Sequence, residues 1–166
     1  GAIGSPQILQ LSGIGPRKLL ERHNIPVVHD LDGVGENLHD HLQIRSVYKV
    51  ENTVTLNQRI RTISGKIMMG LEYIFFKTGP LTMPPSQLGA FAKSDPLQTS
   101  ANMEWHVQPL SLDKFGEPLH KFNAITPAVC NLRPTSRGHV RIKNSKISSH
   151  PSITLNYLST PEDEKI

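Results

Sequence analysis

The run GAIGSPQILQLSGIG at residues 1–15 has the pattern of a helix start followed by a glycine-rich turn. Ser5 can cap a helix through its hydroxyl, and Pro6 suits the first helical position, where a missing N–H costs nothing. We therefore predict a short helix that starts at Pro6 and stops at Gly13, with Gly15 allowing a close turn. The predicted buried face of this helix consists of Ile8, Leu9 and Leu11.

The small residues ahead of this helix, Gly1 and Ala2, allow a second role. Bare amides at a helix N-terminus can approach a phosphate or a nucleotide, because unpaired N–H groups and the helix dipole favour an anion there. An ordinary capped helix packed on a sheet is the simpler interpretation of the same residues. The run by itself leaves both interpretations open.

A second short helix is predicted at residues 16–23, with Asn24 as its left-handed stop. Together with Gly13 and Gly15, this basic helix resembles the helix-hairpin-helix element, whose glycine amides contact DNA phosphates. The loop at residues 32–37 follows, and its glycines and polar residues are typical of a turn that places the next segment. A DNA-binding module is therefore one alternative for the start of the chain.

The longest predicted helix covers about residues 56–77, where apolar residues recur at intervals of three and four. Its apolar positions are Ile60, Ile63, Ile67, Leu71, Ile74 and Phe75. Gly65 and Gly70 each weaken the helix by roughly 1 kcal/mol relative to alanine, so we expect it to bend or to pack closely against another backbone. A stiff loop is predicted at Pro84-Pro85.

Five further segments have the character of strands, at residues 42–50, 87–92, 102–108, 123–132 and 138–143. Strands joined without long intervening helices favour an antiparallel sheet. We predict an α+β fold, an antiparallel sheet with helices packed on one face, preceded by a short helical piece. The predicted core consists of Val47, Ile67, Leu71, Phe91, Trp105, Val107 and Val140.

The composition is that of a folded domain, since 37% of the 166 residues are hydrophobic. The net charge of +4 is spread along the chain and specifies no anionic partner. The single Cys130 excludes an internal disulfide and lies in an apolar stretch, which predicts a buried, inert thiol. No apolar run reaches the roughly 18 residues of a membrane span, and the first residues lack the features of a signal peptide.

Four runs, in order along the chain, resemble the glucose-methanol-choline (GMC) family of flavin-dependent oxidoreductases. Residues 1–15 resemble the second signature of that family. The other runs are GVGENLHDH at residues 33–41, RPTSRGHVRI at residues 133–142, and NYLS with PED within residues 156–163. A helix-hairpin-helix DNA binder has no place for these later runs, so their order favours the oxidoreductase.

The resemblance implies a domain organisation and a cofactor. Residues 1–41 would be a remnant of an FAD-binding domain with the domain connection, and residues 42–166 part of a substrate-binding domain. Gly1 and Ala2 would lie at the FAD. The family's Gly-x-Gly-x-x-Gly turn and its proton-abstracting histidine are absent from the 166 residues. We therefore expect an internal fragment with an incomplete flavin site, no catalytic residue of its own and no activity in isolation.

The run His39-Asp40-His41 invites a metal interpretation, because histidines two apart on an extended backbone point the same way. No further cluster of His, Asp or Glu stands at a supporting spacing, so we expect no metal. The resemblance implies instead that Asn37, Asp40 and His41 form a hydrogen-bonded hub at the domain connection, near the cofactor. A purely structural role for these residues is the alternative.

Gln87 and His106 are the candidate residues of the substrate cavity. The resemblance places Gln87 on a strand that faces the flavin, where choline-oxidising members carry a glutamate whose carboxylate would attract the ammonium group. The neutral Gln87 therefore disfavours choline and favours an uncharged alcohol, with choline dehydrogenation as the alternative. Trp105 and His106 point to opposite faces of one strand, and the resemblance puts His106 on the substrate side. A solvent-facing glutamine and a structural histidine are the plain alternatives.

The resemblance thus implies an enzyme that oxidises an alcohol to an aldehyde or ketone. A hydride would pass to the flavin while a histidine outside this segment removes the hydroxyl proton. The segment itself would supply the cavity wall and part of the flavin surroundings. Its partners would be a small alcohol and the remainder of the same polypeptide, with no nucleic acid and no membrane span in this segment.

Overall fold

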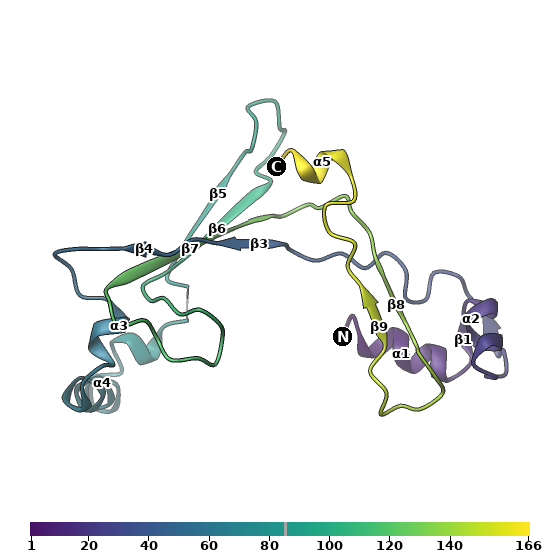
Figure 1. Ribbon diagram of the computed structural model, residues 1–166, viewed down its shortest axis with the longest axis horizontal. Helices are drawn as coiled ribbons and strands as arrows, with labels where there is room; N and C mark the ends of the chain where they lie inside the picture. Colours follow the sequence, from purple (N-terminus) through teal and green to yellow (C-terminus); the bar gives the residue numbers. More distant parts are fainter. Residues whose placement is uncertain (85) are drawn as a thin grey trace. The chain divides into compact units, whose positions relative to one another are not determined.

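The chain forms two compact units, as seen in a computed structural model that describes residues 1–84 and 86–166. Unit 1 consists of Gly1–Leu42 and Arg133–Ile166, and unit 2 consists of Gln43–Leu132. The elements of both units are labelled in Figure 1. The second residue of the predicted Pro84-Pro85 loop lies outside the described residues.

The two units divide the chain differently from the domains predicted from the sequence. Residues 133–166, predicted as part of the substrate-binding domain, belong to the same compact unit as the N-terminal segment. The assignment of residues 1–41 to an FAD-binding domain and of residues 42–166 to a substrate-binding domain stays a prediction about function.

Unit 1 consists of short helices and two small sheets. Its elements are α1 (Gly4–Leu11), β1 (Ile14–Gly15), α2 (Arg17–Arg22), β2 (His29–Asp30), β8 (His139–Arg141), β9 (Ser152–Thr154) and α5 (Pro161–Glu164). Strand β1 pairs in parallel with β2, and β8 pairs antiparallel with β9. The strand predicted at residues 138–143 is therefore present as β8, but it belongs to unit 1 and does not extend the larger sheet.

Helix α1 begins at Gly4, two residues ahead of the predicted start at Pro6. The amide of Ser5 donates to the carbonyl of Gly1 at 3.0 Å, so the turn before the proline is already helical. No side chain caps the helix, and the predicted capping role of Ser5 is wrong. The cap is unnecessary because the amide of Gln7, from which the Ser5 hydroxyl could accept, already donates to the carbonyl of Ile3 at 3.4 Å.

The predicted apolar face of α1 is only partly buried. Ile8 is 58% exposed and Leu9 is 39% exposed, whereas Gln10 is fully buried. Leu11 packs against the small apolar core of unit 1, whose buried members are Leu19, Leu20, Ile25 and Ile142. Helix α1 therefore turns a polar side chain, flanked by apolar ones, toward the centre of the unit.

Helix α2 ends as predicted, because Asn24 has a left-handed backbone with φ of 54°. The turn before it does not form a hairpin loop, since Ile14–Gly15 continue as strand β1. At the start of α2, the backbone N–H and the side-chain Nε of Arg17 both donate to Asp30 at 3.0 Å. This contact fastens α2 to strand β2.

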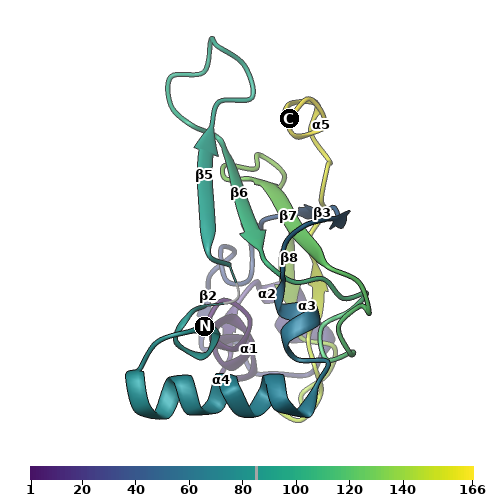
Figure 2. The ribbon, with the colours of Figure 1, turned by 90° about the vertical axis from the view of Figure 1, so that its left-hand side faces the viewer.

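Unit 2 contains the main sheet, and its antiparallel pairing confirms the predicted fold class. The strands are β3 (Gln43–Arg45), β4 (Tyr48–Lys49), β5 (Leu88–Ala92), β6 (Met103–Gln108) and β7 (Ala124–Asn131). Their order is β3-β7-β6-β5, and β4 also pairs with β7. Figure 2 shows the long strands β5, β6 and β7 side by side.

Pro127 explains why the strand predicted at residues 42–50 is broken into β3 and β4. Both short strands pair with β7 in one continuous register. Between them, the amide of Ser46 donates to the carbonyl of Pro127 at 3.0 Å. Proline has no N–H to donate in return, so the ladder is interrupted at residues 46–47.

The helix predicted at residues 56–77 is divided into α3 (Leu56–Arg59) and α4 (Ile63–Phe76), and a short 3₁₀ turn, η1 (Pro80–Thr82), follows. The hydroxyl of Thr62 caps α4 by accepting from the amide of Gly65 at 3.0 Å. A Cβ added at Gly65 would overlap the carbonyl oxygen of Arg59, which confirms the expected close backbone approach there.

The predicted core of unit 2 is largely wrong. No residue of α4 is buried, and Ile67 and Leu71 are 56% and 41% exposed. Val47 and Phe91 are also exposed. Figure 2 shows α4 beyond one end of strands β5 and β6. Within residues 1–84 and 86–166, no helix is both long and apolar enough to cross a membrane.

The side chain of Asp163, on α5, holds the segment that leads into β8. Its carboxylate accepts from the backbone amides of Thr135 and Ser136, each at 2.8 Å. Burial alone would raise the pKa of Asp163, but the hydrogen bonds from Ser136 and Thr135 outweigh it and lower the pKa from 3.8 to about 2. The ionised carboxylate therefore stabilises the folded state.

We expect unit 1 to lose stability in acid through Asp163. The stabilisation is complete above the ordinary pKa of 3.8 and disappears as the pH falls toward about 2. The shift corresponds to about 2 kcal/mol in the free energy of unfolding. The test is acid titration of the unfolding free energy of the full-length protein and of Asp163→Asn, with the exposed Glu162→Gln as control. A difference between wild type and Asp163→Asn that stays constant from about pH 5 to about pH 2 would contradict it.

Candidate functional site

A cavity of about 620 Å³ lies in unit 1, beside the N-terminal end of α1. Helix α1 and the residue before its first turn contribute Ala2, Ser5, Pro6 and Leu9, and β8 contributes Val140. The remaining lining comes from one loop and consists of Leu31, Gly33, Val34, Gly35, Glu36, Asn37, Leu38 and His39. The cavity therefore combines three runs singled out in the sequence, those beginning at residues 1, 33 and 133.

Gln10 holds these three parts of the lining together. Its Nε2 donates to the carbonyls of Val34 at 3.1 Å and Val140 at 3.0 Å, while its Oε1 accepts from the amide of Ile142 at 2.9 Å. The side chain is fully buried, so water cannot replace these bonds. Gln10 was not among the site residues predicted from the sequence. Its one signal was a polar residue within the apolar run of α1.

Gly35 allows the loop to approach β8 closely. Its φ of 88° lies in the left-handed region, and its carbonyl accepts from the amide of Val140 at 2.7 Å. A Cβ at this position would overlap the carbonyl of Val140. Three residues later, Leu38 and Gly138 exchange backbone hydrogen bonds of 3.0 and 2.7 Å. The loop is thus fastened to the strand on both sides of Asn37.

The structure brings some of the predicted cofactor and connection residues together. Ala2 and Asn37 line the cavity, whereas Gly1, Asp40 and His41 are not among its lining residues. The hydroxyl of Tyr157 donates to Asp40 at 2.7 Å. This bond lowers the pKa of Asp40 and raises the pKa of Tyr157. The proposed hub of Asn37, Asp40 and His41 near a cofactor stays a prediction.

The cavity has the size of a small-molecule site, and its lining is mostly apolar with a few polar side chains. Its volume is within the roughly 300–1,000 Å³ of small-molecule sites. Ser5 and Pro6 place the first turn of α1 at its wall, where the helix dipole favours negative charge. The carboxylate of Glu36 in the lining is paired with Arg141 at 2.9 Å. A Cβ added at Gly33 would meet no atom within 4 Å, so the loop leaves open space there.

Of the two predicted substrate-cavity residues, His106 lies in the main sheet of unit 2 and Gln87 lies at its margin. His106 pairs with Gly89, whereas Gln87 is exposed one residue before β5, and its amide donates to the carbonyl of Val107 at 3.1 Å. Because side chains alternate along a strand, His106 shares a face with Gly89, Trp105 points to the other face, and Gln87 adjoins the end of the first. The register places ten residues on the face of His106, and together with the adjoining Gln87 we name them the polar face: Gln43, Arg45, Gly89, Phe91, Glu104, His106, Gln108, Thr126, Ala128 and Cys130.

The charged groups of the polar face have different surroundings. Nε2 of His106 lies 3.3 Å from a carboxylate oxygen of Glu104, and both side chains are largely buried. Arg45 donates from Nη2 to the amide oxygen of Gln108 at 2.9 Å. Cys130 is buried, and desolvation followed by the nearby charge of Glu104 raises its pKa. The predicted burial of this thiol is confirmed, and its inertness stays a prediction that the raised pKa favours.

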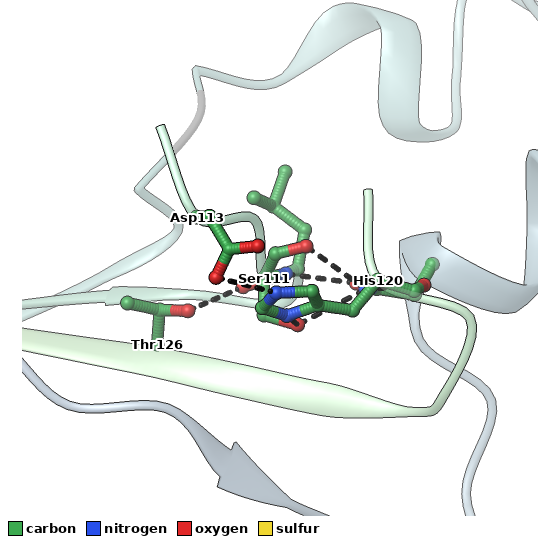
Figure 3. A network of polar contacts seen from close by, with 6 residues as sticks. Ser111, Asp113, His120 and Thr126 are labelled. Carbon is green, nitrogen blue, oxygen red and sulfur yellow. Dashed lines mark hydrogen bonds and ion pairs between the residues drawn. The ribbon is translucent and has the colours of Figure 1, made fainter. Parts of the chain in front are cut away.

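A second polar cluster joins Ser111, Asp113 and His120 (Figure 3). His120 lies 2.9 Å from Ser111 Oγ through Nδ1 and 3.1 Å from Asp113 through Nε2. The set of residues resembles a nucleophilic triad, but Ser111 is fully buried and its Oγ also accepts from the Asn57 side chain at 3.0 Å. A substrate cannot reach this hydroxyl, so the cluster fastens the loop between β6 and β7 to α3.

Comparison with known proteins assigns the start of the chain to a family. The family model described as GMC oxidoreductase matches residues 1–43. The match includes the turn at residues 13–16 on which the helix-hairpin-helix alternative rested. The oxidoreductase family therefore accounts for the same residues.

Relatives and solved structures extend the likeness over nearly the whole chain. The oxygen-dependent choline dehydrogenases of Pectobacterium atrosepticum and Pseudomonas fluorescens are 39% and 38% identical over 163 residues, which cover 98% of this chain and 29% of each relative. A formate oxidase structure from Aspergillus oryzae RIB40 matches with a TM-score of 0.87 at 23% identity, over 99% of this chain and 33% of that chain. The match to this structure shows that the chain has the fold of the corresponding part of formate oxidase.

The chain thus spans less than a third of the length of the curated relatives that it matches. Within that span, the family model, the relatives and the fold agree with the four runs recognised in the sequence. Residues 1–43 thus match the GMC oxidoreductase family model, and 98% of the chain is similar to oxygen-dependent choline dehydrogenases.

Proposed function

We propose that the full-length protein that carries this chain is an FAD-dependent oxidoreductase that oxidises an alcohol to an aldehyde or ketone. The observation that carries the proposal is the convergence of three family-like runs on one cavity of about 620 Å³. Identity of 39% with an oxygen-dependent choline dehydrogenase over 98% of the chain supports it. In this proposal the segment positions cofactor and substrate, and the catalytic base lies elsewhere in the polypeptide.

The cavity in unit 1 fits part of an FAD. Ala2, Gly33 and Asn37 would hold it, since they line a space bounded by the first turn of α1 and a glycine-rich loop. Bound there, FAD would supply the acceptor for a hydride from the alcohol carbon. Gln10 and Gly35 serve this site indirectly, because they fix the loop against β8.

Gln87 and His106 would contact the alcohol on the polar face. Gln87 offers a neutral amide, and His106 offers an imidazole that can exchange hydrogen bonds with a hydroxyl group. Without a carboxylate at Gln87, a quaternary ammonium gains no attraction from this position. The substrate proposed is therefore an alcohol without a quaternary ammonium group. Choline is the second candidate, favoured by the name of the relatives at 37–39% identity.

The proposed function is tested by the flavin absorbance of the purified full-length protein and by its bleaching without oxygen. We expect a yellow protein whose flavin band is bleached by a neutral alcohol and not by choline. A colourless protein that cannot be reconstituted with FAD would overturn the oxidoreductase assignment. Bleaching by choline would keep the family and reject the argument from Gln87.

Gln87→Glu sharpens this test of substrate charge. A new carboxylate on the polar face should raise kcat/KM for choline by roughly tenfold and leave the value for a neutral alcohol within about threefold. The matched control is Gln98→Glu, which adds the same charge to an exposed position in the loop between β5 and β6. Equal changes in both variants would show a long-range charge effect and would reject the role of Gln87.

A further inference from the structure

Arg45 is the cation of the polar face, and it lies in the same row of residues as His106. The row crosses neighbouring strands, since Arg45 pairs with Ala128 and Ala128 pairs with His106. The two side chains therefore project from the same face, about 10 Å apart at the backbone. The residue between them is alanine, so no large side chain of β7 separates them.

The charge of Arg45 has no acidic partner within residues 1–84 and 86–166. Its one hydrogen-bond partner there is the neutral amide of Gln108, at 2.9 Å, and its guanidinium lies 4.5 Å from the ring centre of Phe115. Glu104, the acid of the polar face, forms its contact with His106 at 3.3 Å. Arg45 is half-buried, and a partly desolvated cation without a counter-ion favours binding of an anion.

The contacts of Arg45 also fix its orientation. The amide oxygen of Gln108 accepts a hydrogen bond at one edge of the guanidinium, and the ring of Phe115 lies against one of its faces. Its other N–H donors have no partner in the described part of the chain, and they form the planar fork that matches a carboxylate. The arrangement therefore leaves a group prepared for two parallel hydrogen bonds to one anion.

We propose that Arg45 is a subsite for a carboxylate carried by the alcohol substrate, so that the preferred substrate is a hydroxy acid. This inference rests on the proposed function and refines it. His106 and Gln87 would lie at the hydroxyl end of the substrate, and Arg45 at its acid end. The spacing of about 10 Å between the backbones of Arg45 and His106 leaves room for a short aliphatic chain between the two ends.

The test uses the full-length, FAD-loaded protein with matched ligands. Wild type should oxidise 4-hydroxybutanoate with kcat/KM at least about tenfold above that for 1-butanol, and calorimetric titration should detect binding of butyrate. Arg45→Met keeps the side-chain length and loses the charge, so it should weaken butyrate binding by about tenfold or more and leave kcat/KM for 1-butanol within about twofold.

Two further variants separate the subsite from a structural role. Arg45→Lys should restore part of the butyrate affinity, because it keeps the charge and loses the planar fork. The control variant Arg59→Met, at an exposed position, should change neither the affinity for butyrate nor kcat/KM for the two alcohols. No butyrate binding to wild type, or equal losses of 1-butanol and 4-hydroxybutanoate turnover in Arg45→Met, would overturn the subsite. A full-length protein that binds no flavin would overturn the proposed function. The calorimetric titration would still show whether Arg45 binds a carboxylate.

Discussion

Gly35→Ala should abolish the folded form of unit 1 in the full-length protein. A Cβ at this position overlaps the carbonyl oxygen of Val140 and lies 2.5 Å from Nε2 of Gln10. The backbone at Gly35 also has φ of 88°, which alanine adopts only with strain. Neither Val140 nor Gln10 can move away, because both bond to the same loop. We expect a loss of more than about 4 kcal/mol in the free energy of unfolding.

Thermal unfolding of the purified protein measures this effect. Gly33→Ala is the matched control, since it lies two positions away in the same loop and a Cβ there meets no atom within 4 Å. The control should unfold within about 0.5 kcal/mol of wild type. If Gly35→Ala and Gly33→Ala unfold alike, the close approach of the loop to β8 is wrong.

Replacement of Gln10 should cause the second largest loss in the free energy of unfolding. Replacement by leucine keeps the approximate size of the side chain and leaves the Val34 and Val140 carbonyls and the Ile142 amide unpaired in a fully buried place. We expect a loss of about 3 kcal/mol, because each buried polar group costs about 1–3 kcal/mol without its partner. Gln10→Glu should be worse, since it directs a carboxylate oxygen at two carbonyls.

The unfolding free energy in denaturant, compared with Gln7→Leu, provides the measurement. Gln7 lies on the same helix and its Nε2 donates to the carbonyl of Ser149 at 2.9 Å, but its site is only partly buried. Its replacement should cost about 1 kcal/mol, because water can satisfy the carbonyl that it leaves. If the free energy of unfolding falls less in Gln10→Leu than in Gln7→Leu, the hydrogen bonds of Gln10 do not hold the loop and β8 against α1.

Features set by neighbouring residues could be predicted from the sequence. Asn24 takes the left-handed stop of α2, Gly65 has its close backbone contact, and the strands at residues 87–92, 102–108 and 123–132 are present. Each depends on turn chemistry or on periodicity within a short window. His106 lies on strand β6 as predicted, whereas Gln87 falls one residue before β5.

Features set by distant residues could not be predicted in this way. Periodicity identified α4 as a helix, but burial depends on what covers the apolar side, and here Ile67 and Leu71 are exposed. Gln10 is a further example, because its partners lie up to 132 residues away. Arg45 was overlooked since its place beside Gln108 and Phe115 exists only after β3, β6 and β7 have paired.

The nesting of unit 2 within unit 1 has a consequence for biosynthesis. Gln10 and its partner Val140 are separated by 130 positions, so the first helix leaves the ribosome long before the strand that it needs. At the usual rate of translation this delay is on the order of ten seconds. During that time Gln10 lacks its partners Val140 and Ile142, while the inserted sheet can already fold. Truncation between residues 132 and 140 should therefore yield nascent chains in which Gln43–Leu132 are folded and Gln10 lacks its partners on β8.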